Sequence, residues 1–177
     1  MKEAAKRETE TGEVIEGEGW FVRNLADASW ERDATHGVYC RVEPEDLAFG
    51  QFTANLHIIE PGQPNGLYHA ESDQEGFLVL SGECTLIVEG EEQPMRAWDY
   101  FHCPPGCNHI FVGAGAGPCA ILMLGALGRG GIHYPVDPVA AEHGASALEP
   151  TNVPKEAYAH LDRTRTRERA PWPPSGD

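Results

Sequence analysis

The chain has 177 residues, which is close to the usual size of one domain and long enough to bury a core. Its formal net charge of −15 would repel a polyphosphate backbone, so we expect no nucleic-acid partner. No apolar run approaches the roughly 18 residues of a membrane span, and residues 1–18 are charged where a signal peptide would have its apolar core. We therefore expect no membrane association and a cytoplasmic location.

Five cysteines make an odd count in a chain without an evident export signal, which favours reduced thiols over a disulfide framework. Cys103 and Cys107 form a Cys-x(3)-Cys pair, but a structural zinc site normally needs four closed ligands. We expect these two cysteines to be inert, partly buried thiols.

Both ends of the chain have the composition of tails. Residues 1–18 are rich in Glu and nearly free of large apolar side chains, and residues 161–177 combine an Arg-rich stretch with several prolines. This composition predicts mobile tails on either side of a single domain that covers residues 19–160.

Between the tails, apolar residues occur in short bursts separated by Gly, Pro, Asn and Asp, a rhythm typical of strands and turns. The bursts predict strands, in chain order, at 20–24, 37–42, 52–60, 77–80, 85–89, 100–103, 109–112 and 120–126. Because no interval between consecutive strands suits a crossover helix, we predict an all-β closed barrel or sandwich. One short helix is expected nearer the C-terminus, with Asp137 as its N-cap, Pro138 as its first residue and Gly144 as its stop.

Two stretches carry the side chains that could do chemistry. The first, residues 61–82, holds His69, Glu71 and Glu75, and the second brings His109 just after a Pro-Pro-Gly turn. Residues two apart on an extended strand face the same way, so His69 and Glu71 can point together into a barrel interior. Burying two carboxylates without a cation would be costly, so the joint pattern favours a metal site.

The two stretches resemble the paired motifs of the cupin superfamily, and the resemblance covers roughly residues 50–126. The family places a His-x-His-x(3–4)-Glu-x(6)-Gly pattern before a Gly-x(5)-Pro-x-Gly-x(2)-His pattern. This sequence reads His69-x-Glu71-x(3)-Glu75-x(6)-Gly82, then Trp98-x(5)-Pro104-x-Gly106-x(2)-His109. The resemblance is to small single-domain bacterial cupins of the cupin 2 conserved-barrel type. It implies a jelly-roll barrel that holds one divalent metal ion per chain, with His69, Glu71, Glu75 and His109 as candidate ligands.

The sequence departs from the family pattern at two positions. Trp98 stands where the second motif usually has Gly, which suggests a less tight turn and an aromatic ring packed against the barrel. Glu71 replaces the usual second histidine of the first motif, and two interpretations of it remain open. If it coordinates, two histidines and two carboxylates would suit manganese, iron or zinc. If it stands off the metal, the other three ligands leave open positions, and Glu71 could act as a general base.

The resemblance implies a metal-dependent cupin that acts on a small organic molecule, with dioxygenase or isomerase chemistry as the two candidates. The alternative is a barrel that binds or senses a small ligand without catalysis. A homodimer is also expected, because residues 20–42 carry apolar side chains outside the two motifs and cupins often pair by exchanging N-terminal strands.

Overall fold

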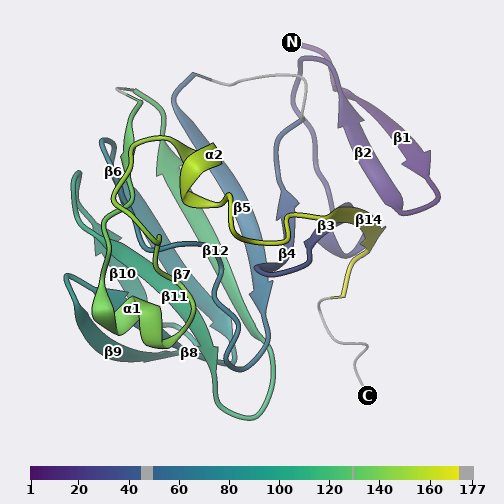
Figure 1. The fold of residues 1–177 in the computed structure, drawn as a ribbon. Coiled ribbons are helices and arrows are strands. Elements are labelled where there is room, and N and C mark those ends of the chain that lie inside the picture. The colour runs from purple at the N-terminus through teal and green to yellow at the C-terminus, as the bar shows by residue number, and fades with distance from the viewer. Residues whose placement is uncertain (45–49, 129, 172–177) are drawn as a thin grey trace.

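The computed structural model describes residues 1–44, 50–128 and 130–171, and within them the chain is built mainly from antiparallel sheets (Figure 1). The largest sheet contains, in spatial order, β10 (Tyr100–Cys103), β7 (Glu75–Ser81), β12 (Cys119–Ala126), β5 (Phe52–Ile59), β4 (Gly37–Arg41), β3 (Ser29–Asp33) and β14 (Arg165–Arg169). A second sheet contains β11 (His109–Ala114), β8 (Glu83–Val88) and β9 (Glu91–Arg96). Two smaller pairs are β1 (Ala5–Thr9) with β2 (Gly12–Glu16), and β6 (Ala70–Glu71) with β13 (Ile132–His133). The all-β fold class predicted from the sequence is confirmed.

Seven of the eight predicted strand ranges coincide with β4, β5, β7, β8, β10, β11 and β12. The prediction of a strand over residues 20–24 is wrong. There, Trp20 makes only an isolated bridge to Glu3, and Asn24 caps the short 3-10 helix η1 (Leu25–Asp27) by accepting from the Ala26 amide. The sequence also failed to predict β3, β9 and the two-residue strands β6 and β13. Most of β9 is exposed, so it lacks the apolar alternation that would have revealed it.

The terminal segments differ from the tails that composition predicts. Residues 5–16 form the β1-β2 hairpin, and β14 adds to the free edge of β3. Arg32 on β3 holds Glu168 on β14 through two hydrogen bonds of 2.7 and 2.8 Å. The charged residues of β14, whose composition is typical of a solvated tail, therefore pair with the charged strand β3, which is distant in sequence. Residues 172–177 lie outside the described residues.

Apolar side chains fill two regions on opposite faces of the large sheet. The space between the two sheets holds a cluster that includes Phe77, Phe111 and Ile121. The other face of the large sheet carries a second cluster around Trp30, Val38 and Leu56. The strand register produces both, because successive residues of β5 and β12 alternate between the two faces.

The chain after β12 runs across the barrel as β13, α1 (Pro138–Glu142) and α2 (Pro154–Ala157), as Figure 1 shows in light green to yellow-green. The predicted helix is confirmed: the Asp137 side chain accepts from the Ala140 amide, Pro138 occupies the first turn, and Gly144 follows with φ of 67°. Ala140 then packs on Tyr68 and its buried neighbours. None of the helices among the described residues has the length and apolar character of a membrane-spanning helix.

Candidate metal centre

The structure brings three of the four predicted ligands into one group. His69 precedes β6, Glu75 begins β7 and His109 begins β11. The two histidines share an antiparallel bridge, with the His69 amide 3.2 Å from the His109 carbonyl and the His109 amide 2.8 Å from the His69 carbonyl. One donor atom from each of His69, Glu75 and His109 lies within 4.8 Å of the other two. The sequence spacing therefore does converge on one point of the barrel.

Hydrogen bonds fix which nitrogen of each imidazole faces that point. His69 Nδ1 lies 2.7 Å from the Leu67 carbonyl oxygen, and His109 Nδ1 lies 3.2 Å from the Cys107 carbonyl oxygen. A carbonyl only accepts, so Nδ1 carries the proton in both rings and each neutral ring keeps a lone pair on Nε2. This arrangement, in which the far nitrogen is tied to a backbone oxygen, is typical of metal-ligating histidines.

Glu75 faces the two imidazoles from β7. Its Oε2 lies 3.6 Å from His109 Nε2, and this oxygen is buried with no hydrogen-bond partner among the described residues. Burial, followed by the nearby charge of Glu71, raises the pKa of Glu75 to about 8. The buried carboxylate oxygen and the two imidazole lone pairs together form a set of electron-pair donors. A bound cation would supply the positive charge that this set lacks.

Glu71 lies at the margin of this group. Its Oε1 is 3.9 Å from His69 Nε2, and 36% of its side chain is exposed, compared with 12% for Glu75. Burial and then the charge of Asp73 raise the pKa of the Glu71 carboxyl. Pairing of β6 with β13 fixes its backbone, because Glu71 lies opposite Ile132. A carboxyl with a raised pKa next to a candidate metal ligand can serve as a ligand or as an acid or base.

Aromatic rings enclose the His109 side of the centre. The Phe77 ring centroid lies 5.0 Å from that of His109, and the Phe101 centroid lies 5.8 Å from it. Burial, and then the neighbouring His69, lowers the pKa of His109 to about 3, so its imidazole is neutral at neutral pH. The apolar surroundings thus keep His109 Nε2 unprotonated and available to bind an ion.

Two further residues singled out in the sequence have other surroundings. Cys103 is buried, its Sγ lies 3.4 Å from His109 Nδ1, and burial raises its pKa, which keeps it a thiol. Trp98 does not pack against the barrel as its position in the motif suggested. Its φ of 75° lies in the left-handed region that glycine favours, and 77% of the residue is exposed. The turn therefore keeps the tight glycine-like backbone, and the indole points to solvent.

Sequence reasoning missed two tyrosines that lie behind His69. The Tyr134 ring centroid is 5.7 Å from that of His69, and Tyr158 packs edge-on against Tyr134 at 5.6 Å. Both come from the segment after β12, beyond the two motifs. Neither stands in a recognisable pattern, so only the fold reveals them.

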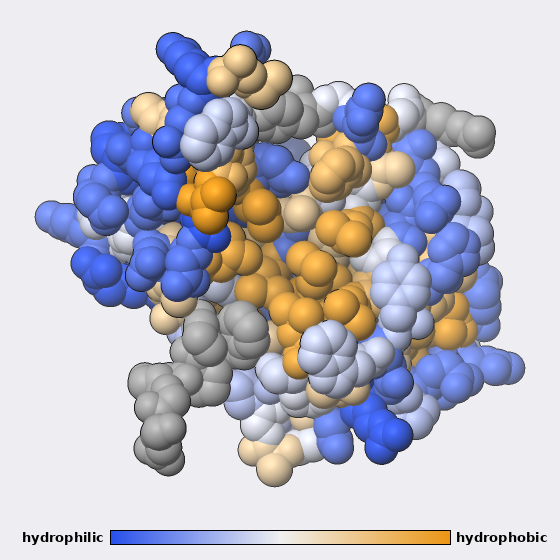
Figure 2. Space-filling view, turned by 180° about the vertical axis from the view of Figure 1, so that it is seen from behind, coloured by the Kyte–Doolittle hydropathy of each residue, from blue (hydrophilic) through white to orange (hydrophobic). Residues whose placement is uncertain are grey.

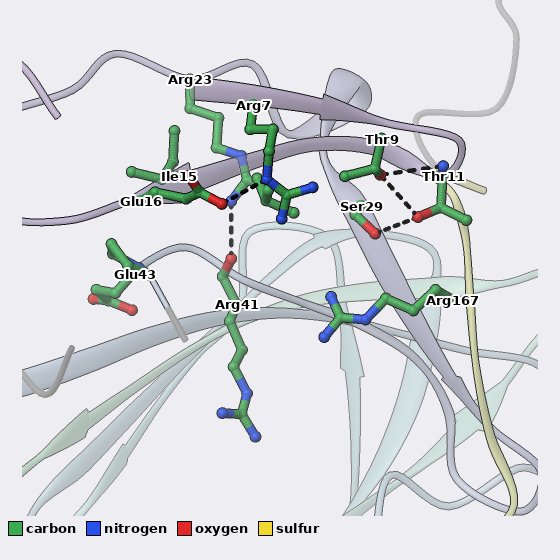
Figure 3. A pocket seen from close by; sticks show the side chains of 12 residues that line it. Arg7, Thr9, Thr11, Ile15, Glu16, Arg23, Ser29, Arg41, Glu43 and Arg167 are labelled. Carbon is green, nitrogen blue, oxygen red and sulfur yellow. Dashed lines mark hydrogen bonds and ion pairs between the residues drawn. The ribbon is translucent and has the colours of Figure 1, made fainter. Parts of the chain in front are cut away.

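A cleft of about 650 Å³ lies between the β1-β2 hairpin and strands β3, β4 and β14 (Figure 3). Arginines line it, but protein groups already engage several of them. Arg7 Nε lies 2.5 Å from Glu16 Oε1, and the buried Arg23 donates to the carbonyl oxygens of Glu13 and Arg41. None of the four predicted site residues lines this cleft. It is a seam between the hairpin and the sheet, which the Arg23 side chain bridges by its hydrogen bonds to β2 and β4.

Comparisons with known proteins agree with this fold and these motifs. Residues 55–125 match the family model of the cupin domain, Cupin_2. A search of curated proteins found no significant match. A sugar phosphate isomerase of the cupin superfamily from Silicibacter pomeroyi is 27% identical with a TM-score of 0.48, and the match covers 54% of this chain and 62% of that one. The chain thus spans less than two thirds of that isomerase.

Two other solved structures are similar in fold. A cupin 2 conserved barrel domain protein from Salinispora arenicola is 21% identical, with a TM-score of 0.51 over 61% of this chain and 89% of that one. The polyketide cyclase RemF from Streptomyces resistomycificus is 14% identical, with a TM-score of 0.55 over 81% of this chain and 94% of that one. At these identities the likeness concerns the fold alone. Together with the family match, it shows that residues 55–125 form a cupin domain of the cupin 2 type.

Proposed function

We propose that the protein is a metal-dependent cupin that acts on a small organic molecule, with one divalent ion held by His69, Glu75 and His109. The observation that carries the proposal is the unpartnered Oε2 of Glu75, buried 3.6 Å from His109 Nε2. The backbone bonds at both Nδ1 atoms leave the Nε2 lone pairs as donors. A cation would satisfy all three donors at once, whereas no hydrogen bond from the described part of the chain satisfies the carboxylate oxygen.

Two histidines and one carboxylate leave coordination positions open, which suits manganese, iron or zinc. The bound ion would supply Lewis acidity to a substrate oxygen, and redox chemistry if it is iron or manganese. The chain's own contribution is an apolar wall, formed by Phe77 and Phe101, that limits water near the site. Isomerase chemistry needs only a Lewis acid, so the native metal separates it from dioxygenase chemistry.

The proposal is tested by elemental analysis of protein purified without added metal, followed by titration of the metal-free protein with Mn²⁺, Fe²⁺ and Zn²⁺. We expect about one ion per chain and saturable binding of at least one of the three. Absence of binding by every ion tested would refute the metal-dependent function. Zinc as the only ion present and bound would count against a dioxygenase.

Glu71→Gln distinguishes the two roles of Glu71. As a fourth ligand, Glu71 contributes a charge that glutamine lacks, so we expect metal affinity to fall about 10-fold or more. As a general acid or base, it could be replaced with unchanged affinity and loss of turnover only. Metal titration of the variant is the measurement, and Glu92→Gln on the exposed face of β9 is the control. Unchanged affinity would exclude coordination by Glu71.

We also propose that the protein is a homodimer that pairs through the outer face of the large sheet. Phe52, Tyr100 and Leu124 lie on this face through the strand register and are exposed by 55%, 57% and 37%. Apolar side chains also gather across the middle of the molecule when it is seen from behind (Figure 2). Large contiguous apolar surfaces are uncommon on monomers, and a second copy of the same face would cover this one.

Leu124→Glu is expected to convert the dimer to a monomer, because it would bury a charge at the centre of the pairing surface. Light scattering after size-exclusion chromatography gives the mass directly. Leu148→Glu serves as the control, since Leu148 is 71% exposed on the C-terminal segment. A monomeric wild-type protein would contradict the proposed dimer.

A further inference from the structure

The C-terminal segment, residues 131–161, lies outside the matched cupin domain yet packs against the loop that carries His69. Leu67, which is fully buried, forms a cluster there with Tyr134, Ala147 and Ala157. The Tyr68 amide also donates to the Ala145 carbonyl at 2.6 Å. Leu67 and Tyr68, the two residues before His69, are therefore held by a segment that lies outside the two motifs.

One hydroxyl in this segment reaches the backbone next to His69. The Leu67 amide donates to the Tyr158 hydroxyl at 3.1 Å, and the carbonyl of the same residue accepts from His69 Nδ1 at 2.7 Å. Leu67 is closed to solvent, so its amide depends on the Tyr158 hydroxyl as its hydrogen-bond partner. Tyr158 thus fixes the residue whose carbonyl sets the orientation of the His69 ring.

Tyr158 is itself held in place from two sides. The Arg163 guanidinium lies 4.3 Å above its ring, and Arg163 Nε lies 2.9 Å from Asp33 Oδ2. The ring of His36 meets the Tyr158 ring edge-on at 5.4 Å. The side chain therefore has little freedom to leave the Leu67 amide. The contacts run without a break from β3 to the metal centre.

The glycine at position 66 fits this contact closely. A Cβ added to Gly66 would lie 3.1 Å from the Tyr158 hydroxyl oxygen, which is tighter than an ordinary contact. The backbone there does not require glycine for its φ, because Gly66 has no positive φ. An added methyl group would press on the hydroxyl and on little else.

We infer that Tyr158 is a positioning residue of the metal centre, so that the C-terminal segment completes a site whose ligands all lie in the cupin domain. This inference rests on the proposed metal function. Tyr158 sets the position of Leu67, and Leu67 in turn holds the Nδ1–H tautomer of His69 that leaves Nε2 free for an ion.

The test is Tyr158→Phe, which keeps the ring and removes only the hydroxyl. We expect the dissociation constant for Mn²⁺ to rise about 10-fold, as for other residues that orient ligands. The electron paramagnetic resonance spectrum of bound Mn²⁺ should change as well. In metal-free protein, long-range ¹H–¹⁵N spectra should show the single Nδ1–H tautomer of His69 replaced by a mixture. Circular dichroism checks the fold, and Tyr39→Phe, half-buried elsewhere in the large sheet, is the control.

Gly66→Ala provides a second route to the same contact. Alone it should weaken Mn²⁺ binding by a smaller factor, and in the Tyr158→Phe background it should add no further loss, because the hydroxyl it presses on is gone. Unchanged affinity and an unchanged His69 tautomer in folded Tyr158→Phe would overturn the inference. Failure of the wild-type protein to bind any ion, with the tautomer still shifting in the variant, would overturn the metal function and leave the positioning role supported.

Discussion

Replacing His109 by alanine should reduce metal affinity by more than about 100-fold, beyond the range that changes to outer-shell partners produce. His109 is 2% exposed and its Nδ1 is bound to the Cys107 carbonyl, so Nε2 is the nitrogen that it offers to an ion, and alanine removes this donor. Glu75→Gln should have an effect of similar size, because the amide removes the charge that Glu75 brings to a buried site. Elemental content after purification and titration with Mn²⁺ measure both losses.

His102→Ala is the matched control for His109. His102 lies on β10, close in sequence to His109, but its side chain is exposed and is not part of the group formed by His69, Glu75 and His109. Its removal should leave metal content unchanged. Equal metal content in His109→Ala and the wild-type protein would contradict the assignment of the site, provided that thermal unfolding shows the variant to be folded.

Trp30→Ala should lower the free energy of unfolding by about 3–5 kcal/mol. Trp30 is fully buried on the outer side of the large sheet, where it packs with Val38 and Leu56. Its Nε1 also donates to the Leu25 carbonyl at 2.8 Å, so truncation leaves both a cavity and an unpaired backbone oxygen. Urea unfolding measures the difference.

Trp98→Ala offers the matched comparison for Trp30. Because the Trp98 side chain projects into solvent, its loss should change the free energy of unfolding by no more than about 0.5 kcal/mol. Alanine leaves the strain of the positive φ at position 98 unchanged. The comparison of Trp98→Ala with Trp30→Ala therefore reports mainly how deeply each side chain is buried. A small effect at Trp30 would show that the surrounding cluster can collapse around the missing ring.

The sequence predicts those features that depend on local pattern. Alternating apolar residues located most strands of the barrel, and the Asp137, Pro138 and Gly144 signals located α1, because caps act within one turn of a helix. The fixed offsets of His69, Glu75 and His109 also predicted that they meet, since the motif encodes a known strand geometry.

What the sequence could not show depends on contacts between distant segments. β14 is ordered by pairing with β3, and Tyr158 enters the site through a loop that no motif positions. The φ of Trp98 is equally invisible, because a bulky residue normally avoids the left-handed region and the hydrogen bonds of the turn impose it here.

The pairing of β3 with β14 has a consequence for how the protein forms. Glu168 stands 136 positions after its partner Arg32, so the edge of the large sheet is closed by a strand that is synthesised long after β3. Such non-local pairing slows folding, since loop-closure entropy is lost before the contacts form. Until β14 has been synthesised, one edge of β3 has no strand partner. During that interval the nascent chain is most prone to associate with other chains through this edge.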